Sequence, residues 1–156
     1  MKNILVVDLD GTLVSTDMLY ESFWSAFSKD WTVLIKSFFW LLKGKANLKN
    51  NLYIVSNIDV TNLPYNNEVI DLIKKYKKKS THIALVTATN QNMANKIANY
   101  LNIFDEVKGS TNKINLQGKL KANFLKNRYG ARGFDYVGDS LDDLHSWKKA
   151  KKAILV

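Results

Sequence analysis

Residues 6–14 read VVDLDGTLV, an apolar run that is interrupted by two carboxylates. Residues 4–7, ILVV, are apolar throughout, which is typical of a strand covered on both faces of a sheet. Asp8 and Asp10 follow this run two residues apart, so in an extended chain their side chains point the same way. Two neighbouring carboxylates repel each other unless a cation lies between them. Mg²⁺ would suit this place, because it prefers oxygen ligands and often shares them with a substrate phosphate.

A second acidic cluster, YVGDSLDDL at residues 136–144, follows another apolar run. Asp139 comes directly after Gly138, and Asp142 and Asp143 follow after a further turn. The two motifs together hold five of the 14 acidic residues of a chain whose net charge is +9. If both strands end at the same edge of a sheet, we expect these acids to meet at one metal ion.

Apolar runs alternate with helical patterns along most of the chain, which favours an α/β fold with a mainly parallel five-stranded sheet and helices on both faces, a three-layer Rossmann-like arrangement. Strands are predicted at 4–7, 82–86, about 106–107, 134–137 and 153–156, and helices at about 67–79, 90–101, 119–129 and 141–149. Ligands of such sheets bind beyond the carboxyl ends of the strands.

Residues 18–64 interrupt this alternation and are predicted to form a small helical cap, which leaves 1–17 and 65–156 as the core. Apolar residues between positions 20 and 42 recur with helical spacing, and many are aromatic. A small insert has little interior, so two alternatives stay open for these aromatics. They pack within the cap, or they contact an apolar leaving group, a membrane surface or another chain. The run at 31–42 is too short to span a bilayer, which takes about 20 residues.

Phosphate-binding groups are expected near the second strand and the helix at 119–129. Thr87 ends the HIALV run, and its hydroxyl can donate to a phosphoryl oxygen. We expect the NH groups of Ala88 and Thr89 at the start of a helix, where they favour an anion. Either Lys121 or Lys119 could neutralise the remaining phosphate charge.

The ordered motifs DLDGTL, VTAT, a lysine and GDSLDD resemble the signature of the haloacid dehalogenase-like (HAD) phosphatase superfamily. The resemblance covers the chain apart from the insert. DLDGTLVSTDMLYES, FFWLLKGKANLK, LPYNNEV and FDYVGDS are also similar to the HAD-type domain that precedes a ubiquinone-biosynthesis-type prenyltransferase domain in some bacterial proteins.

This resemblance implies a role for each residue of the motifs. Asp8 would be the nucleophile that forms an aspartyl-phosphate, and Asp10 would protonate the leaving group and then activate water. Mg²⁺ would be bound by the carboxylate of Asp8, the carbonyl of Asp10 and Asp139. Asp143 is the expected further acid of the metal site, with Asp142 as the alternative.

Thr87 and Ala88 would bind the substrate phosphate together with Lys121, for which Lys119 remains the alternative. The resemblance thus implies a Mg²⁺-dependent phosphatase that hydrolyses a phosphomonoester. We expect the short cap to leave the mouth of the site partly open, which suits a lipid-linked phosphate or a small phosphorylated metabolite. One alternative is a phosphoprotein phosphatase, including a phosphotyrosine phosphatase. Another is a weakly active or non-catalytic basic module that docks on a membrane or a partner.

The net charge of +9 favours anionic partners such as phosphates and anionic membrane surfaces, whereas we do not expect nucleic acid. The absence of cysteine excludes disulfides and thiolate metal sites. The first apolar run is too short for a signal peptide, so a cytoplasmic location is expected. Because Val156 ends the last predicted strand, we expect a C-terminal partner domain, through which the protein would associate with a membrane.

Overall fold

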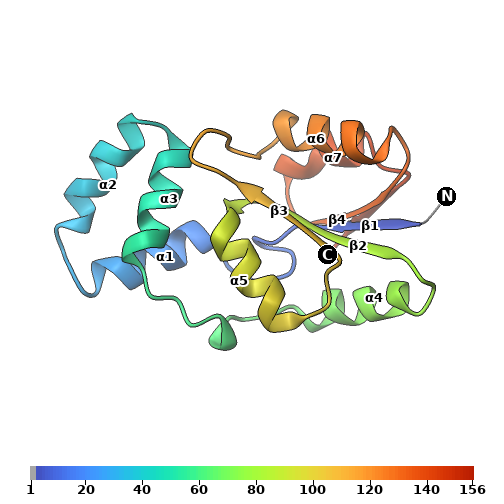
Figure 1. Ribbon diagram of the computed structural model, residues 1–156, viewed down its shortest axis with the longest axis horizontal. Coiled ribbons are helices and arrows are strands. Elements are labelled where there is room, and N and C mark those ends of the chain that lie inside the picture. The colour runs from blue at the N-terminus through green and yellow to red at the C-terminus, as the bar shows by residue number, and fades with distance from the viewer. Residues whose placement is uncertain (1–2) are drawn as a thin grey trace.

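The computed structural model describes residues 3–156, and these form an α/β fold around one parallel sheet (Figure 1). Its five strands lie in the order β3-β2-β1-β4-β5. They are β1 (Ile4–Val7), β2 (His82–Asn90), β3 (Glu106–Ser110), β4 (Asp135–Gly138) and β5 (Lys152–Leu155). The predicted fold class is therefore confirmed.

Helices cover both faces of the sheet (Figure 1). Helices α4 (Asn67–Lys77) and α5 (Gln91–Leu101) pack on one face, and α6 (Lys119–Tyr129) and α7 (Leu144–Trp147) on the other. Successive side chains of β1 point to opposite faces, as the period of a strand requires. Leu5 and Val7 join the apolar cluster beneath α4 and α5, whereas Val6 joins the cluster beneath α6.

The register of the strands determines where the acidic motifs meet. In the parallel ladders, Val7 is opposite Leu85 of β2 on one side and Val137 of β4 on the other. The NH of Asp8 donates to the carbonyl of Val137, with 3.1 Å between the two atoms. The chain segments that follow β1 and β4 therefore leave the sheet side by side, at the edge where ligands of such sheets bind.

The segment predicted as a cap forms helices α1 (Met18–Phe27), α2 (Val33–Leu42) and α3 (Lys45–Val55) and the 3₁₀ helix η1 (Val60–Asn62). Helix α1 begins after Asp17, whose side chain accepts from the NH groups of Leu19 and Tyr20. The cap has a small interior, in which Ala26, Val33 and Leu52 are buried. In Figure 1, α1, α2 and α3 lie to the left of the sheet.

Two predicted boundaries are corrected. Strand β2 continues to Asn90, so Ala88 and Thr89 lie in a strand and not at the start of a helix. The helix predicted at 141–149 is instead the short 3₁₀ helix η2 (Leu141–Asp143) followed by α7. Within residues 3–156, no helix combines the length and the apolar character needed to cross a bilayer.

Candidate active site

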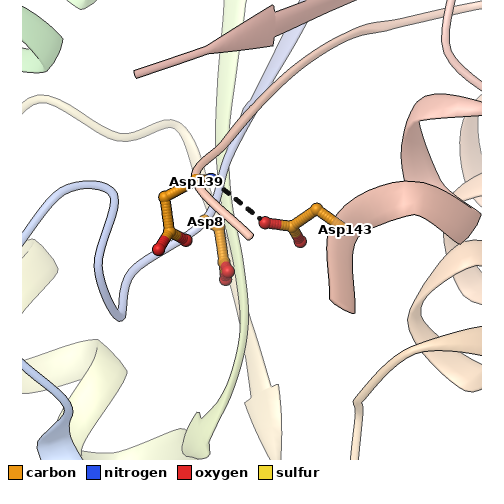
Figure 2. A group of neighbouring side chains, drawn as sticks. All are labelled: Asp8, Asp139 and Asp143. Atoms are coloured by element: carbon orange, nitrogen blue, oxygen red, sulfur yellow. Dashed lines mark hydrogen bonds between the residues drawn. The ribbon is translucent and has the colours of Figure 1, made fainter. Parts of the chain in front are cut away.

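Three carboxylates from distant parts of the chain form a cluster at the carboxyl edge of the sheet. Asp8 follows β1, Asp139 follows β4 and Asp143 ends η2 (Figure 2). One oxygen of each lies within 4.8 Å of the others, which is a spacing that can hold a metal ion. We call Asp8, Asp139 and Asp143 the carboxylate cluster.

Two glycines make room for this cluster. Gly11 has a φ of +73°, a conformation that favours glycine, and a Cβ atom at this position would collide with the carboxylate of Asp139. A Cβ atom at Gly138 would collide in the same way with the carboxylate of Asp143. The glycines in DLDG and VGDS therefore allow the backbone to approach the acids closely.

Hydrogen bonds fix the orientation of Asp143. Its Oδ1 accepts from the hydroxyl of Tyr136 at 2.6 Å, and its Oδ2 accepts from the NH of Asp139 at 3.3 Å, which is the dashed line in Figure 2. Asp142 is exposed and accepts instead from the side chain of Gln117 at 2.6 Å. The structure thus places Asp143 in the site, and Asp142 outside it.

Lys121 is the lysine that reaches the cluster. Its Nζ lies 2.9 Å from Oδ1 of Asp8 and 3.3 Å from Oδ1 of Asp143. Burial alone would lower the pKa of this ammonium, but the facing carboxylates of Asp8 and Asp143 outweigh it and raise the pKa. Lys119, by contrast, is exposed. Of the two lysines left open by the sequence, only Lys121 contacts the acids.

The carboxylate of Asp8 has properties that suit a cation ligand. Burial raises its pKa to about 7; Lys121 opposes this shift, and the nearby carboxylates of Asp143 and Asp10 add to it. Its Oδ1 is buried and receives no aligned hydrogen bond from residues 3–156, although the ammonium of Lys121 is close. Burial also raises the pKa of Asp139. A divalent cation bound by these oxygens would favour their charged forms, so the donor set fits Mg²⁺.

Asp10 lies beside the cluster, but its carboxylate does not belong to it. Its Oδ1 accepts from the NH of Met18 at 2.7 Å, and its Oδ2 accepts from the hydroxyl of Thr89 at 2.7 Å. Burial raises the pKa of Asp10, although these two hydrogen bonds oppose the shift. The carboxylate is therefore oriented towards the base of the cap, and the metal contact expected of its carbonyl stays a prediction.

Thr87 and Ala88 lie next to Asp10, although not in the way expected. The hydroxyl of Thr87 is 3.4 Å from Oδ2 of Asp10 and accepts from the NH of Thr89. The NH of Thr89 is therefore already bonded, which corrects the expectation of a helix terminus open to an anion. The carbonyl of Ala88 accepts from Nζ of Lys49, with 2.7 Å between the atoms.

Lys49 comes from α3 of the cap and belongs to no motif, so it was not among the predicted site residues. Burial lowers the pKa of its ammonium, and the carboxylates of Asp10 and Asp17 oppose that shift. A second bond between cap and core joins the side chains of Asn90 and Asn50 at 3.1 Å. The cavity left beside Lys49 and Thr89 has a volume of about 10 Å³, about the least that one water molecule requires. On this side the cap packs closely against the core, and the expectation of a partly open mouth stays a prediction.

The sequence comparisons give a relative but no family model. No family model matches the chain. It is 36% identical over 152 residues to the uncharacterised protein y4nM of Sinorhizobium fredii (strain NBRC 101917 / NGR234), a match that covers 97% of this chain and 29% of that protein. The chain thus spans less than a third of the length of this relative.

Solved structures of phosphatases and hydrolases share the fold. A phosphoserine phosphatase, solved as a phospho-aspartyl intermediate analogue, superposes with a TM-score of 0.68 at 19% identity, over 99% of this chain and 86% of that one. A HAD family hydrolase, t0658 from Salmonella enterica serovar Typhi, superposes with a TM-score of 0.66 at 13% identity, over 95% of this chain and 60% of that one. The chain therefore has the fold of the HAD hydrolases.

Proposed function

We propose that this chain is a Mg²⁺-dependent phosphatase that hydrolyses a phosphomonoester through an aspartyl-phosphate on Asp8. The observation that carries the proposal is the carboxylate cluster, whose members lie within 4.8 Å of one another, with Nζ of Lys121 2.9 Å from Asp8. The fold is shared with a phosphoserine phosphatase that was solved with an analogue of a phospho-aspartyl intermediate. That likeness supports the chemistry proposed for Asp8.

In the first half of the reaction, a carboxylate oxygen of Asp8 forms a bond to phosphorus, and the bond from phosphorus to the leaving oxygen breaks. Asp10 gives its proton to that oxygen. Burial raises the pKa of Asp10, which favours the protonated form that a general acid needs. The bonds from Met18 and Thr89 fix the direction of its carboxyl group.

In the second half, Asp10 accepts a proton from water while the water oxygen bonds to phosphorus. The bond from phosphorus to Asp8 then breaks, which releases phosphate and restores the carboxylate of Asp8. Lys121 stays beside Asp8 throughout and stabilises the negative charge of the phosphoryl group. The hydroxyl of Thr87, which faces Asp10, is the proposed further donor to this group.

The residues proposed to hold Mg²⁺ are the carboxylate cluster and the carbonyl of Asp10. When bound, Mg²⁺ supplies positive charge to phosphoryl oxygens and keeps the nucleophilic carboxylate ionised. The buried, poorly bonded Oδ1 of Asp8 and the raised pKa values of Asp8 and Asp139 support this assignment.

The contact between cap and core bears on the substrate class. Lys49 and Asn50 of the cap bond to the core, and the cavity beside Lys49 and Thr89 holds only about 10 Å³, so this side of the site favours a small group over a protein segment. We therefore propose a small phosphorylated metabolite or a lipid-linked phosphate in preference to a phosphoprotein. The similarity to domains that precede a prenyltransferase domain supports the inclusion of lipid-linked phosphates.

The direct test is phosphate release from an aryl phosphate by the wild-type chain and by Asp8→Asn. We expect release that requires Mg²⁺ and stops with chelator, and a loss of about 10³-fold or more in Asp8→Asn. Acid-quenched wild type should carry one extra phosphoryl group by intact mass. Release that persists with chelator, or in Asp8→Asn, would show the mechanism to be wrong.

A matched pair of neighbours tests the metal site. Asp143→Asn should strongly raise the Mg²⁺ concentration needed for half-maximal activity, because Asp143 is buried in the cluster, whereas the exposed Asp142→Asn should behave as wild type. A comparison of phosphopeptides with small and lipid-linked phosphates then ranks the substrates. No turnover of any of them, with the fold intact, would favour the non-catalytic alternative.

A further inference from the structure

The outer face of helix α2 is entirely apolar and exposed. Its six large side chains have between 47% and 69% of their surface exposed: Leu34, Ile35, Phe38, Phe39, Leu41 and Leu42. At about 100° per residue, these positions occupy one continuous arc of about 160° around the helix. The opposite side holds the buried Val33 and the partly buried Trp40, which pack within the cap. We call the six exposed residues the outer face of α2.

This face points away from the rest of the molecule. Helix α2 lies at the end of the molecule farthest from the sheet, beyond α3 (Figure 1). The exposed Trp31 lies just before it in the chain. Soluble monomers rarely expose a contiguous apolar surface of this kind without a use for it, so the outer face of α2 is best explained as a surface that binds something.

The charges beside the face point to the partner. Between residues 28 and 48 the chain has four basic residues and one acidic residue: Lys29, Lys36, Lys43, Lys45 and Asp30. By helical spacing, Lys36 and Lys43 lie on one flank of the apolar arc. Lys36 pairs with Asp30 at 2.7 Å, but within residues 3–156 no carboxylate lies within 4.0 Å of Lys43 or Lys45.

A second copy of this chain does not match these charges. Packing two outer faces of α2 together would bring their lysine flanks together in chains of net charge +9, and like charges disfavour such an association. An anionic bilayer matches both features, because acyl chains accept the apolar arc and lipid phosphates accept the ammonium groups. With only ten residues, α2 is too short to span a bilayer and would lie in its surface.

We propose that the outer face of α2 docks on an anionic lipid surface, with Phe38 and Phe39 in the acyl region and Lys43 and Lys45 at the headgroups. This docking is independent of catalysis and therefore of the proposed function. It assigns a use to apolar side chains that the folded cap does not bury. It also makes the cap, and not the sheet, the part of the molecule that contacts the membrane.

The test is co-sedimentation of the full chain with vesicles. Wild type should sediment with phosphatidylcholine vesicles that contain phosphatidylserine, and at least about tenfold more weakly with phosphatidylcholine alone. The double variant Phe38→Ser/Phe39→Ser should bind the anionic vesicles more weakly than wild type by a similar factor. The control variant Ile114→Ser/Leu155→Ser replaces two exposed apolar residues that lie outside the cap, and it should bind as wild type.

Charge variants separate a specific surface from general attraction. Lys43→Glu/Lys45→Glu should weaken binding, whereas Lys78→Glu/Lys79→Glu, an equal charge change at exposed positions at the end of α4, should weaken it much less. Three results would overturn the proposal. The first is an equal loss of vesicle binding in the two lysine double variants. The second is unchanged vesicle binding of Phe38→Ser/Phe39→Ser. The third is a dimer that wild type forms without lipid and that Phe38→Ser/Phe39→Ser does not form.

Discussion

The sheet core and the helical cap use apolar side chains in opposite ways. In the core, two apolar clusters cover the two faces of the sheet, and Leu5 and Leu85 are completely buried. The cap buries only Ala26, Val33 and Leu52 in a cluster of its own, while the outer face of α2 stays in contact with solvent. Apolar burial thus explains the shape of the core, but it leaves much of the apolar surface of the cap unexplained.

This difference matters for the chemistry. Asp8, Lys121 and Asp143 are buried and stand on elements that the two core clusters hold in place. The helices α1 and α3 of the cap meet the core through Met18 and Tyr53, which pack on the apolar cluster, and through the bonds from Lys49 to Ala88 and between Asn90 and Asn50. The end of the insert is anchored more firmly, because Ile58, Val60 and Leu63 are buried in the same cluster. We therefore interpret the core as a rigid support for the acids and the cap as the part that can move to admit substrate.

Among the variants that compare core and cap, the largest effect is expected at Asp10, where the two regions meet. Asp10→Asn should lower kcat on an aryl phosphate by about 10²–10⁴-fold, because it removes the proton donor. Its thermal unfolding should change little, since the amide oxygen still accepts from the NH of Met18. Asp17→Asn is the control, because asparagine also caps a helix and this residue is exposed. Equal activities of the two variants would contradict the role of Asp10.

A leucine-to-alanine substitution, made once in the core and once in the cap, measures the contrast in burial. Leu85→Ala should lower the free energy of unfolding by about 2–5 kcal/mol, because it leaves a cavity in the core. Leu34→Ala on the outer face of α2 should change it by no more than about 0.5 kcal/mol. Urea unfolding measures both values. A large loss in Leu34→Ala would mean that α2 is packed and that the contrast is false.

The parts of the site that depend on strand order could be predicted from the sequence. The parts that depend on how the helices pack could not. Parallel strands share their carboxyl edge, so the meeting of Asp8 with Asp139 follows from the alternating pattern. Lys119 and Lys121 are two residues apart on α6 and point to nearly opposite sides, at about 200°. Only the way in which α6 packs on the sheet selects Lys121, and no local signal encodes that.

Other site residues differ in how far the sequence could have identified them. Thr89 is two residues from Thr87 in the same strand, so the two hydroxyls share a face, and the VTAT motif contained this signal. Lys49 had no such signal, because its position depends on how α3 folds back onto the core. The exposed aromatic residues of α2 had the helical pattern of a packed face, and only the structure shows that no part of residues 3–156 covers them.

A moderate effect is expected where Lys49 joins the cap to the core. Lys49→Met should lower kcat/KM on a small soluble phosphate by about tenfold, because it removes a hydrogen bond from a partly buried ammonium to the carbonyl of Ala88. Amide hydrogen exchange in residues 18–64 should become faster, while exchange in the sheet stays as in wild type. Lys45→Met, an exposed residue of the same helix, is the matched control. Unchanged exchange in Lys49→Met would show that this bond does not hold the cap.

The smallest effect concerns Asp30, which organises the turn between α1 and α2. Hydrogen bonds from Lys36 and then Thr32 lower the pKa of its carboxyl to about 2, from an ordinary value of 3.8. A lowered pKa stabilises the folded state above the ordinary value, and that contribution disappears as pH falls through the folded value. Asp30→Asn should therefore have a slightly lower Tm than wild type from pH 7 down to about 4, with the difference shrinking as pH approaches 2. The side chain of Asp30 is 43% exposed, so solvent screening keeps the difference small. A Tm difference that disappears already near pH 4, or an NMR titration of the Asp30 carboxyl with an ordinary midpoint, would show that these bonds do not favour its charged form.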